Sequence, residues 1–195
     1  MKKLLVLLFL TSAIFCPEDE KPVIANYDAT LHEKAVTEIF FQNQKYLFED
    51  SDLLDQSTPQ EIEKSHKHDV KCFLANPEYK HKVLTRSGDI AGFISFSIKK
   101  GQRVKSKIKS KSSLWLHALA VSKEYQRQGL GRMLINEAIA QGKKYKPSPA
   151  IAKLNVMAKN NAAQALYNAE GFTVSKVQPR NPYALVQYEK NIEND

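Results

Sequence analysis

Apolar residues in the first part of the chain recur every three or four positions, which is the spacing of one face of a helix. This pattern follows a short apolar strand at residues 23–27 and begins behind capping residues at 28–30. Pro59 opens a second helical stretch, which ends with an Asn-Pro pair at 76–77. The first part of the chain therefore predicts one strand followed by two helices.

Further along, the apolar positions form short runs that are typical of strands. The runs at 81–86 and 90–98 flank a Ser-Gly-Asp turn and predict an antiparallel hairpin, and a third run follows at 113–121. Helical spacing returns at 131–141, and Gly142 with two lysines marks the predicted end of that helix.

The remaining part of the chain continues this alternation. It predicts a fully buried strand at 150–158, a helix at 161–169 that stops before Gly171, and two final strands at 172–177 and 183–190. The complete order is β-α-α-β-β-β-α-β-α-β-β, in which antiparallel strands precede one β-α-β crossover. We therefore predict one mixed α/β sheet flanked by helices, in a single domain.

The composition agrees with one globular domain and gives no sign of a metal site. Of the 195 residues, 43% are hydrophobic and 26% are charged, which is the balance of a soluble globular protein. The two cysteines, Cys16 and Cys72, form no Cys-x-x-Cys motif, and the five histidines lack zinc-finger or His-Glu-x-x-His spacing. We expect no bound metal.

One segment, Lys99 to Lys111, holds seven basic residues and no acidic one in a chain of net charge +8. Such a segment is either a patch for nucleic acid, anionic lipid or an acidic substrate, or a solvated, flexible hairpin loop. We favour the loop, because the segment lacks the interleaved aromatic side chains on which bases stack. Nucleic acid is therefore not an expected partner.

The first 16 residues have the layout of a secretory signal peptide. Lys2 and Lys3 precede an apolar run at 4–10 and small residues at 11–13, and an acidic segment follows at 17–20. The apolar run is shorter than the roughly 20 residues that a transmembrane helix needs, so we expect no transmembrane span. The alternative is an apolar N-terminal segment that is not cleaved.

A glycine turn lies between the strand at 113–121 and the helix that follows it. Its pattern is Gln-x-x-Gly-x-Gly, formed by Gln126, Gly129 and Gly131. A P-loop needs four residues between its glycines, and a dinucleotide fingerprint needs a third glycine where Leu134 stands, so both nucleotide motifs are excluded. Two residues without a Cβ allow a close approach of the backbone to a ligand, and the first N–H groups of the helix suit a pyrophosphate. A purely structural turn is the alternative.

A second motif follows about thirty residues later, with the pattern Asn-x-x-Ala-x-x-Leu-Tyr-x-x-x-Gly-Phe. Its residues are Asn160, Ala163, Leu166, Tyr167, Gly171 and Phe172. With the glycine turn, this segment resembles the GNAT superfamily of acetyl-CoA-dependent N-acetyltransferases. The resemblance extends over roughly residues 23–190.

The resemblance implies a GNAT acyl-CoA N-acyltransferase fold, in which two central parallel strands of the mixed sheet splay apart. It implies transfer of acetyl from acetyl-CoA to a primary amine, by direct attack through a tetrahedral intermediate. The implied coenzyme-binding residues belong to the central strand, the glycine turn and the second motif: Leu119, Ala120, Val121, Gln126, Arg127, Gln128, Gly129, Leu130, Gly131, Arg132, Asn160 and Ala163.

Three residues are candidates for the chemistry. Tyr167 matches the family's general acid. Asn155 stands where relatives that act on ribosomal-protein amino termini often carry glutamate, and an amide does not accept the proton. His117 on the neighbouring strand is the titratable substitute, with a pKa near neutrality when unperturbed. A histidine satisfied within the sheet and a water chain from a more distant glutamate are the alternatives to His117.

The acceptor is not named by any motif, and we expect a small-molecule amine or a peptide amine. An alternative function is an acyl-CoA-binding or sensing module of the same fold that is catalytically weak, which the asparagine at 155 favours. The localisation stays open, because the leader suggests export whereas dependence on acetyl-CoA suggests the cytosol. The oligomeric state is also open.

Overall fold

The computed structural model describes residues 21–48, 59–101, 103–104, 107–108, 111–179 and 184–193. The predicted signal peptide at 1–16 lies outside the described residues. No helix in these ranges is both long and apolar enough to cross a membrane.

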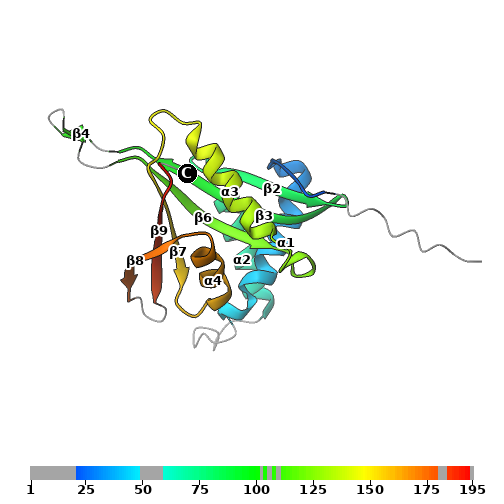
Figure 1. Cartoon of the computed structure of the whole chain (residues 1–195). Coiled ribbons are helices and arrows are strands. Elements are labelled where there is room, and N and C mark those ends of the chain that lie inside the picture. The colour runs from blue at the N-terminus through cyan, green and yellow to red at the C-terminus, as the bar shows by residue number, and fades with distance from the viewer. Residues whose placement is uncertain are drawn as a thin grey trace, which may run out of the picture.

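The described residues form one large mixed sheet with helices on both faces (Figure 1). Its strands lie in the spatial order β1-β2-β3-β6-β7-β9-β8. Their bounds are β1 Val23–Asn26, β2 Lys80–Arg86, β3 Asp89–Lys99, β6 Ser113–Val121, β7 Ile151–Met157, β8 Thr173–Gln178 and β9 Leu185–Asn191. The helices are α1 Ala29–Phe48, α2 Pro59–Leu74, α3 Leu130–Lys143 and α4 Asn161–Ala169, and a short 3-10 helix, η2, covers Lys123–Tyr125. The predicted order of these elements and the mixed α/β class are confirmed.

Within the basic segment, where a hairpin loop was expected, β4 (Arg103–Val104) pairs antiparallel with β5 (Lys107–Ile108). Figure 1 shows β4 well beyond the end of the large sheet. The predicted end of this helix at Gly142 and two lysines is confirmed, because α3 ends at Lys143 and Lys144 is its C-cap. A Cβ added at Gly142 would be 3.3 Å from Leu114 Cδ2. This glycine therefore serves close packing of α3 against the sheet.

Two apolar cores hold the helices to opposite faces of the sheet. The larger core joins α3 and α4 to the sheet through fully buried side chains such as Leu134, Leu154 and Phe172. The smaller core joins α1 and α2 to β2 and β3 through Val36 and Phe93. Burial on both faces fixes the positions of the strands between the helices.

The central strands β6 and β7 separate along their length. They are parallel and pair from Ser113↔Ile151 to Leu116↔Leu154, but β6 continues to Val121 and β7 to Met157 without further pairing between them. Each strand stays paired on its other side, β6 with β3 and β7 with β9. The predicted splay of the two parallel strands is confirmed, and it opens a gap in the middle of the sheet.

Candidate active site

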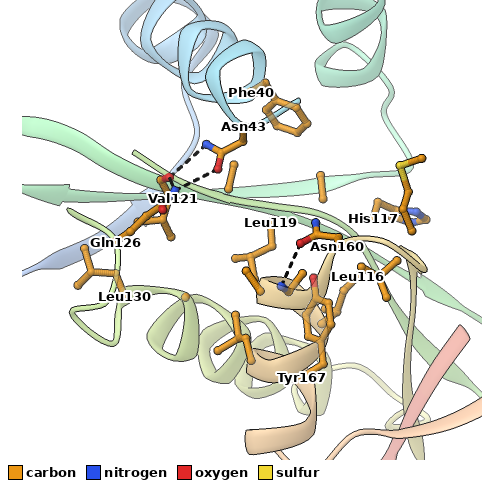
Figure 2. A pocket seen from close by; sticks show the side chains of 18 of the residues that line it. Phe40, Asn43, Leu116, His117, Leu119, Val121, Gln126, Leu130, Asn160 and Tyr167 are labelled. Atoms are coloured by element: carbon orange, nitrogen blue, oxygen red, sulfur yellow. Dashed lines mark hydrogen bonds between the residues drawn. The ribbon is translucent and has the colours of Figure 1, made fainter. Parts of the chain in front are cut away.

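A cavity of about 1050 Å³ occupies the gap between β6 and β7 (Figure 2). Residues from α1, α2, β6, the glycine turn, β7 and α4 line it. Its volume lies at the upper end of the range of small-molecule and cofactor sites. All of the predicted site residues except Gln128 line this cavity, so segments from three parts of the sequence meet there.

The glycine turn opens onto the cavity through its backbone. Gly129 is the N-cap of α3 and has a left-handed φ of 79°, and Arg127 is also left-handed with a φ of 62°. A Cβ added at Gly129 would have no atom within 4 Å. The first helical hydrogen bond runs from Met133 N–H to the Gly129 carbonyl, so the N–H groups before it belong to the unpaired first turn of α3. An anion fits such a site, because these N–H groups carry partial positive charge.

The second glycine of the turn has a different role. A Cβ on Gly131 would lie 3.0 Å from Leu166 Cδ2. Gly131 therefore allows α3 to pack closely against α4, whereas the sequence suggested that both glycines make room for a ligand. This contact links the two sequence motifs directly.

A hydrogen-bonded cluster closes one end of β6. The Val121 carbonyl accepts from Asn43 Nδ2 and from Gln126 Nε2, each at 3.1 Å. Gln126 Nε2 also lies 3.3 Å from Asn43 Oδ1 (Figure 2). Asn43 Nδ2 also donates to the Ile39 carbonyl at 2.8 Å. The Gln126 side chain thus ties the turn to β6 and α1. Sequence reasoning missed Asn43, because a single asparagine on a helix has no recognisable motif.

Two other polar side chains of the turn contact the protein surface around it. Gln128 accepts a hydrogen bond from Arg86 Nη1 and donates to the Glu124 carbonyl at 3.2 Å. Arg132 forms an ion pair with Glu170. Arg127 is exposed and lines the cavity.

The second motif forms the opposite wall. Asn160 is the N-cap of α4, and its side chain accepts from the Ala163 N–H at 3.1 Å, so the asparagine and alanine of the motif are joined by a helix cap. Tyr167 is only 9% exposed, and its ring packs on Phe172 and Tyr188 with centroids 6.0 and 6.1 Å away. Figure 2 shows the Tyr167 hydroxyl directed toward the cavity.

His117 lies where β6 and β7 begin to separate. It is the extra residue of a β-bulge, because Ser95 pairs with Ala118 while Phe96 pairs with Leu116. Its Nε2 is 2.7 Å from Ser97 Oγ, and its ring stacks on Tyr79 at 4.2 Å. Burial, with smaller contributions from the charges of Lys99 and His81, lowers the pKa of His117 to about 4. The imidazole is therefore neutral at physiological pH, and it is a weak base.

The other polar groups on β7, on β9 and in the cavity wall include one amide and two carboxylates. Asn155 follows Leu154, the last β7 residue that pairs with β6. It is exposed, and its partner on β9 is Gln187, which is not titratable. Glu189 on β9 bonds Lys153 at 2.7 Å, and this hydrogen bond lowers the pKa of its carboxyl. Asp69 on α2 is the one carboxylate among the described residues that line the cavity. No described group of three His, Cys, Asp or Glu side chains is arranged to hold a metal ion.

The splayed strands, the open first turn of α3 and the capped helix that carries Tyr167 lie around one cavity. The chain matches the Acetyltransferase (GNAT) family over residues 42–172, which is more than half of its length. The protein therefore belongs to the GNAT family of acetyltransferases. No curated protein matches the chain.

Solved structures share this fold at low sequence identity. PH1933 from Pyrococcus horikoshii is 18% identical, with a TM-score of 0.62, and the match covers 88% of this chain and 98% of that one. The ribosomal-protein-S18-alanine N-acetyltransferase from Escherichia coli is 23% identical, with a TM-score of 0.58 and coverage of 90% and 96%. Arabidopsis thaliana NAA60 in complex with acetyl-CoA is 15% identical, with a TM-score of 0.58 and coverage of 88% and 99%.

Proposed function

We propose that this protein transfers an acetyl group from acetyl-CoA to a primary amine, which attacks the thioester directly through a tetrahedral intermediate. The observation that carries the proposal is a single cavity with the open N-terminus of α3 at one end and Tyr167, His117 and Asn155 farther along it. The NAA60 structure with acetyl-CoA supports this donor. The Escherichia coli N-acetyltransferase, which is named for a protein amine, supports an amine acceptor.

In this proposal the first turn of α3 binds the pyrophosphate of the coenzyme. The space at Gly129 admits a phosphate to the backbone, and Arg127 supplies a full positive charge at the cavity wall. Among the described residues β6 has no partner strand on the side of the gap beyond Leu116, so its backbone at Leu119 and Ala120 suits an extended pantetheine. A β6 N–H also suits the oxyanion that forms on the thioester carbonyl.

The chemical step exchanges one bond for another. The amine nitrogen forms a bond to the acetyl carbon, the carbon–sulfur bond breaks, and the ammonium proton goes to water. Tyr167 donates its hydroxyl proton to the leaving thiolate and recovers a proton from solvent. A histidine whose pKa is about 4 is a poor general base at neutral pH, so we assign His117 and Asn155 to orienting an acceptor that reacts as the neutral amine.

The test is release of the coenzyme thiol from acetyl-CoA in the presence of amino acids, polyamines, aminoglycosides and peptide amino termini. We expect release with at least one class and its strong reduction in Tyr167→Phe. Binding of the coenzyme without release, across every class, contradicts the proposal. That outcome supports the second candidate, a coenzyme-binding module with little turnover, which the lowered pKa of His117 and the amide at Asn155 favour.

A further inference from the structure

A second hollow, of about 530 Å³, adjoins the cavity at His117. It is lined by Glu78, Tyr79, Ser97, Ile98, Lys99, Lys100 and His117. Among the described residues, His117 is the one that lines both spaces. The volume is within the range of small-molecule sites, so a small organic group fits there with one end at His117.

The wall between the two spaces is held in place by side chains from distant segments. The bulge in β6 offsets His117 from the regular pairing with β3. Ser97, which is 6% exposed, fixes one ring nitrogen through a hydrogen bond of 2.7 Å, and Tyr79 covers one face of the ring. His117 therefore forms a preorganised boundary between the cavity and the hollow.

The charge of the hollow is positive. It contains two lysines, Lys99 and Lys100, against one carboxylate, Glu78. Within the described part of the chain neither lysine forms an ion pair, and Lys99 lies over the ring of Trp115 with its Nζ 4.8 Å from the centroid. A hollow with an excess of cationic groups and a nearby serine hydroxyl favours an anionic group on its ligand.

We propose that this hollow binds the acetyl acceptor, and that it selects amines that also carry an anionic group such as a carboxylate. The inference rests on the proposed acetyl transfer: the acceptor's anionic group lies near Lys99 and Lys100, and its amine reaches past His117 into the gap. Glu78 opposes the anion at the rim and weakens the preference. An amine of the same length without a negative charge offers no anionic partner to the ammonium groups of Lys99 and Lys100.

The test compares three acceptors: γ-aminobutyrate, γ-aminobutyramide, in which a neutral amide replaces the carboxylate, and the dication of diaminobutane. We expect kcat/KM for γ-aminobutyrate to exceed that for the amide by about fivefold at low salt, as a partly exposed charge pair allows, and diaminobutane to be the poorest acceptor. Lys99→Met with Lys100→Met removes both charges but keeps the apolar stems, and we expect kcat/KM for γ-aminobutyrate and for γ-aminobutyramide to become equal. Glu78→Gln increases the preference. Lys144→Met, an exposed substitution at the end of α3, is the control and leaves the preference unchanged.

A binding measurement separates failure of this inference from failure of acetyl transfer. Trp115 is the single tryptophan of the chain and lies under Lys99, so its fluorescence reports on the hollow without turnover. Saturable quenching by γ-aminobutyrate that is lost in the double lysine variant supports binding of an anionic amine in the hollow. If this quenching occurs without thiol release, the proposed function alone is wrong. Thiol release with equal efficiency for carboxylate and amide, or a preference that survives the double substitution, overturns the anionic acceptor and leaves acetyl transfer standing. Absence of both quenching and release overturns both proposals.

Discussion

The two ends of the cavity are built in different ways. At the end near α3 the shape comes from the backbone: a left-handed Gly129, the open first turn of a helix, and the unpaired edge of β6. At the end near His117 the shape comes from side chains, because Ser97 and Tyr79 hold the ring from two different segments. Backbone features of this kind suit a ligand that is the same for all members of a fold, whereas differences in side chains allow members of one fold to bind different substrates. The comparison predicts that substitutions at the first end affect coenzyme binding and that those at the second end affect acceptor choice.

The largest effect is expected for Gly129→Val, which places a side chain at the end of the cavity near α3. Its φ of 79° is unfavourable for a β-branched residue, and the new side chain extends into open space at the cavity wall. We expect the affinity for acetyl-CoA, measured by isothermal titration calorimetry, to fall by about 100-fold or more, which is roughly 3 kcal/mol.

Gly88→Val is the matched control for this substitution. Gly88 has a φ of 84°, it also has no atom within 4 Å of an added Cβ, and it lies in the turn between β2 and β3, away from the cavity. Both variants carry similar backbone strain, so we expect a lower melting temperature in both. We expect weaker coenzyme binding in Gly129→Val alone. Equal coenzyme affinities in the two variants contradict the placement of the pyrophosphate.

The next largest effect is expected for Tyr167→Phe. Loss of the proton donor lowers kcat by about 100-fold, the lower range for general acid catalysis, with little change in KM for acetyl-CoA. Tyr188→Phe is the control, since Tyr188 is buried beside Tyr167 and loses only a hydrogen bond to Gln164. Comparable losses of kcat in both variants assign Tyr167 to packing.

The sequence predicted the backbone end of the site well, because each of its features lies within one short segment. The glycine turn and the capped helix are local patterns, and the order of strands and helices along the chain followed from the spacing of apolar residues. The end of α3 at Gly142 and the two lysines was also a local pattern, whereas the close packing of Gly142 on Leu114 joins two segments and was not predictable.

The side-chain end was not predictable in the same way. Tyr79, Ser97 and His117 come from three separate segments and meet through strand pairing and a one-residue bulge, which apolar spacing does not reveal. The sequence identified His117 as titratable, but its lowered pKa depends on burial among those neighbours. Asn43 and Asp69 reach the cavity from helices that carry no motif.

Asn43→Leu tests whether α1 helps to hold the glycine turn in place. The change removes one donor to the Val121 carbonyl and the acceptor of a Gln126 hydrogen bond, so the end of β6 and the start of the glycine turn lose a common anchor on α1. We expect KM for acetyl-CoA to rise by about tenfold in steady-state kinetics, with kcat within twofold of the wild type. Gln42→Leu makes the same chemical change one residue away, where the side chain bonds Glu38 on the helix surface. If the two variants have the same KM, the turn is held in place without α1.

The smallest effect expected is the pH dependence that His117 confers on stability. Its pKa is about 4 in the folded protein, against 6.5 for an ordinary histidine, so the unfolded chain binds a proton at a higher pH than the folded one. The stabilisation from keeping the ring neutral is therefore complete above about pH 7 and is lost progressively as the pH falls through 6.5 toward 4. Between pH 7 and 5.5 this loss amounts to about 1 kcal/mol in the free energy of unfolding, measured by urea denaturation. His117→Asn removes the titrating group, so the difference in the free energy of unfolding between wild type and variant changes by that amount over this range. A constant difference places His117 in a solvated, unperturbed environment.

The pH profile of activity tests the role of the same ring. Between pH 7 and 5.5 we expect kcat/KM to follow the protonation of the acceptor amine, with no inflection near 6.5, because the ring is already neutral there. An inflection at that pH makes His117 the general base and the side-chain end of the cavity a site of proton transfer.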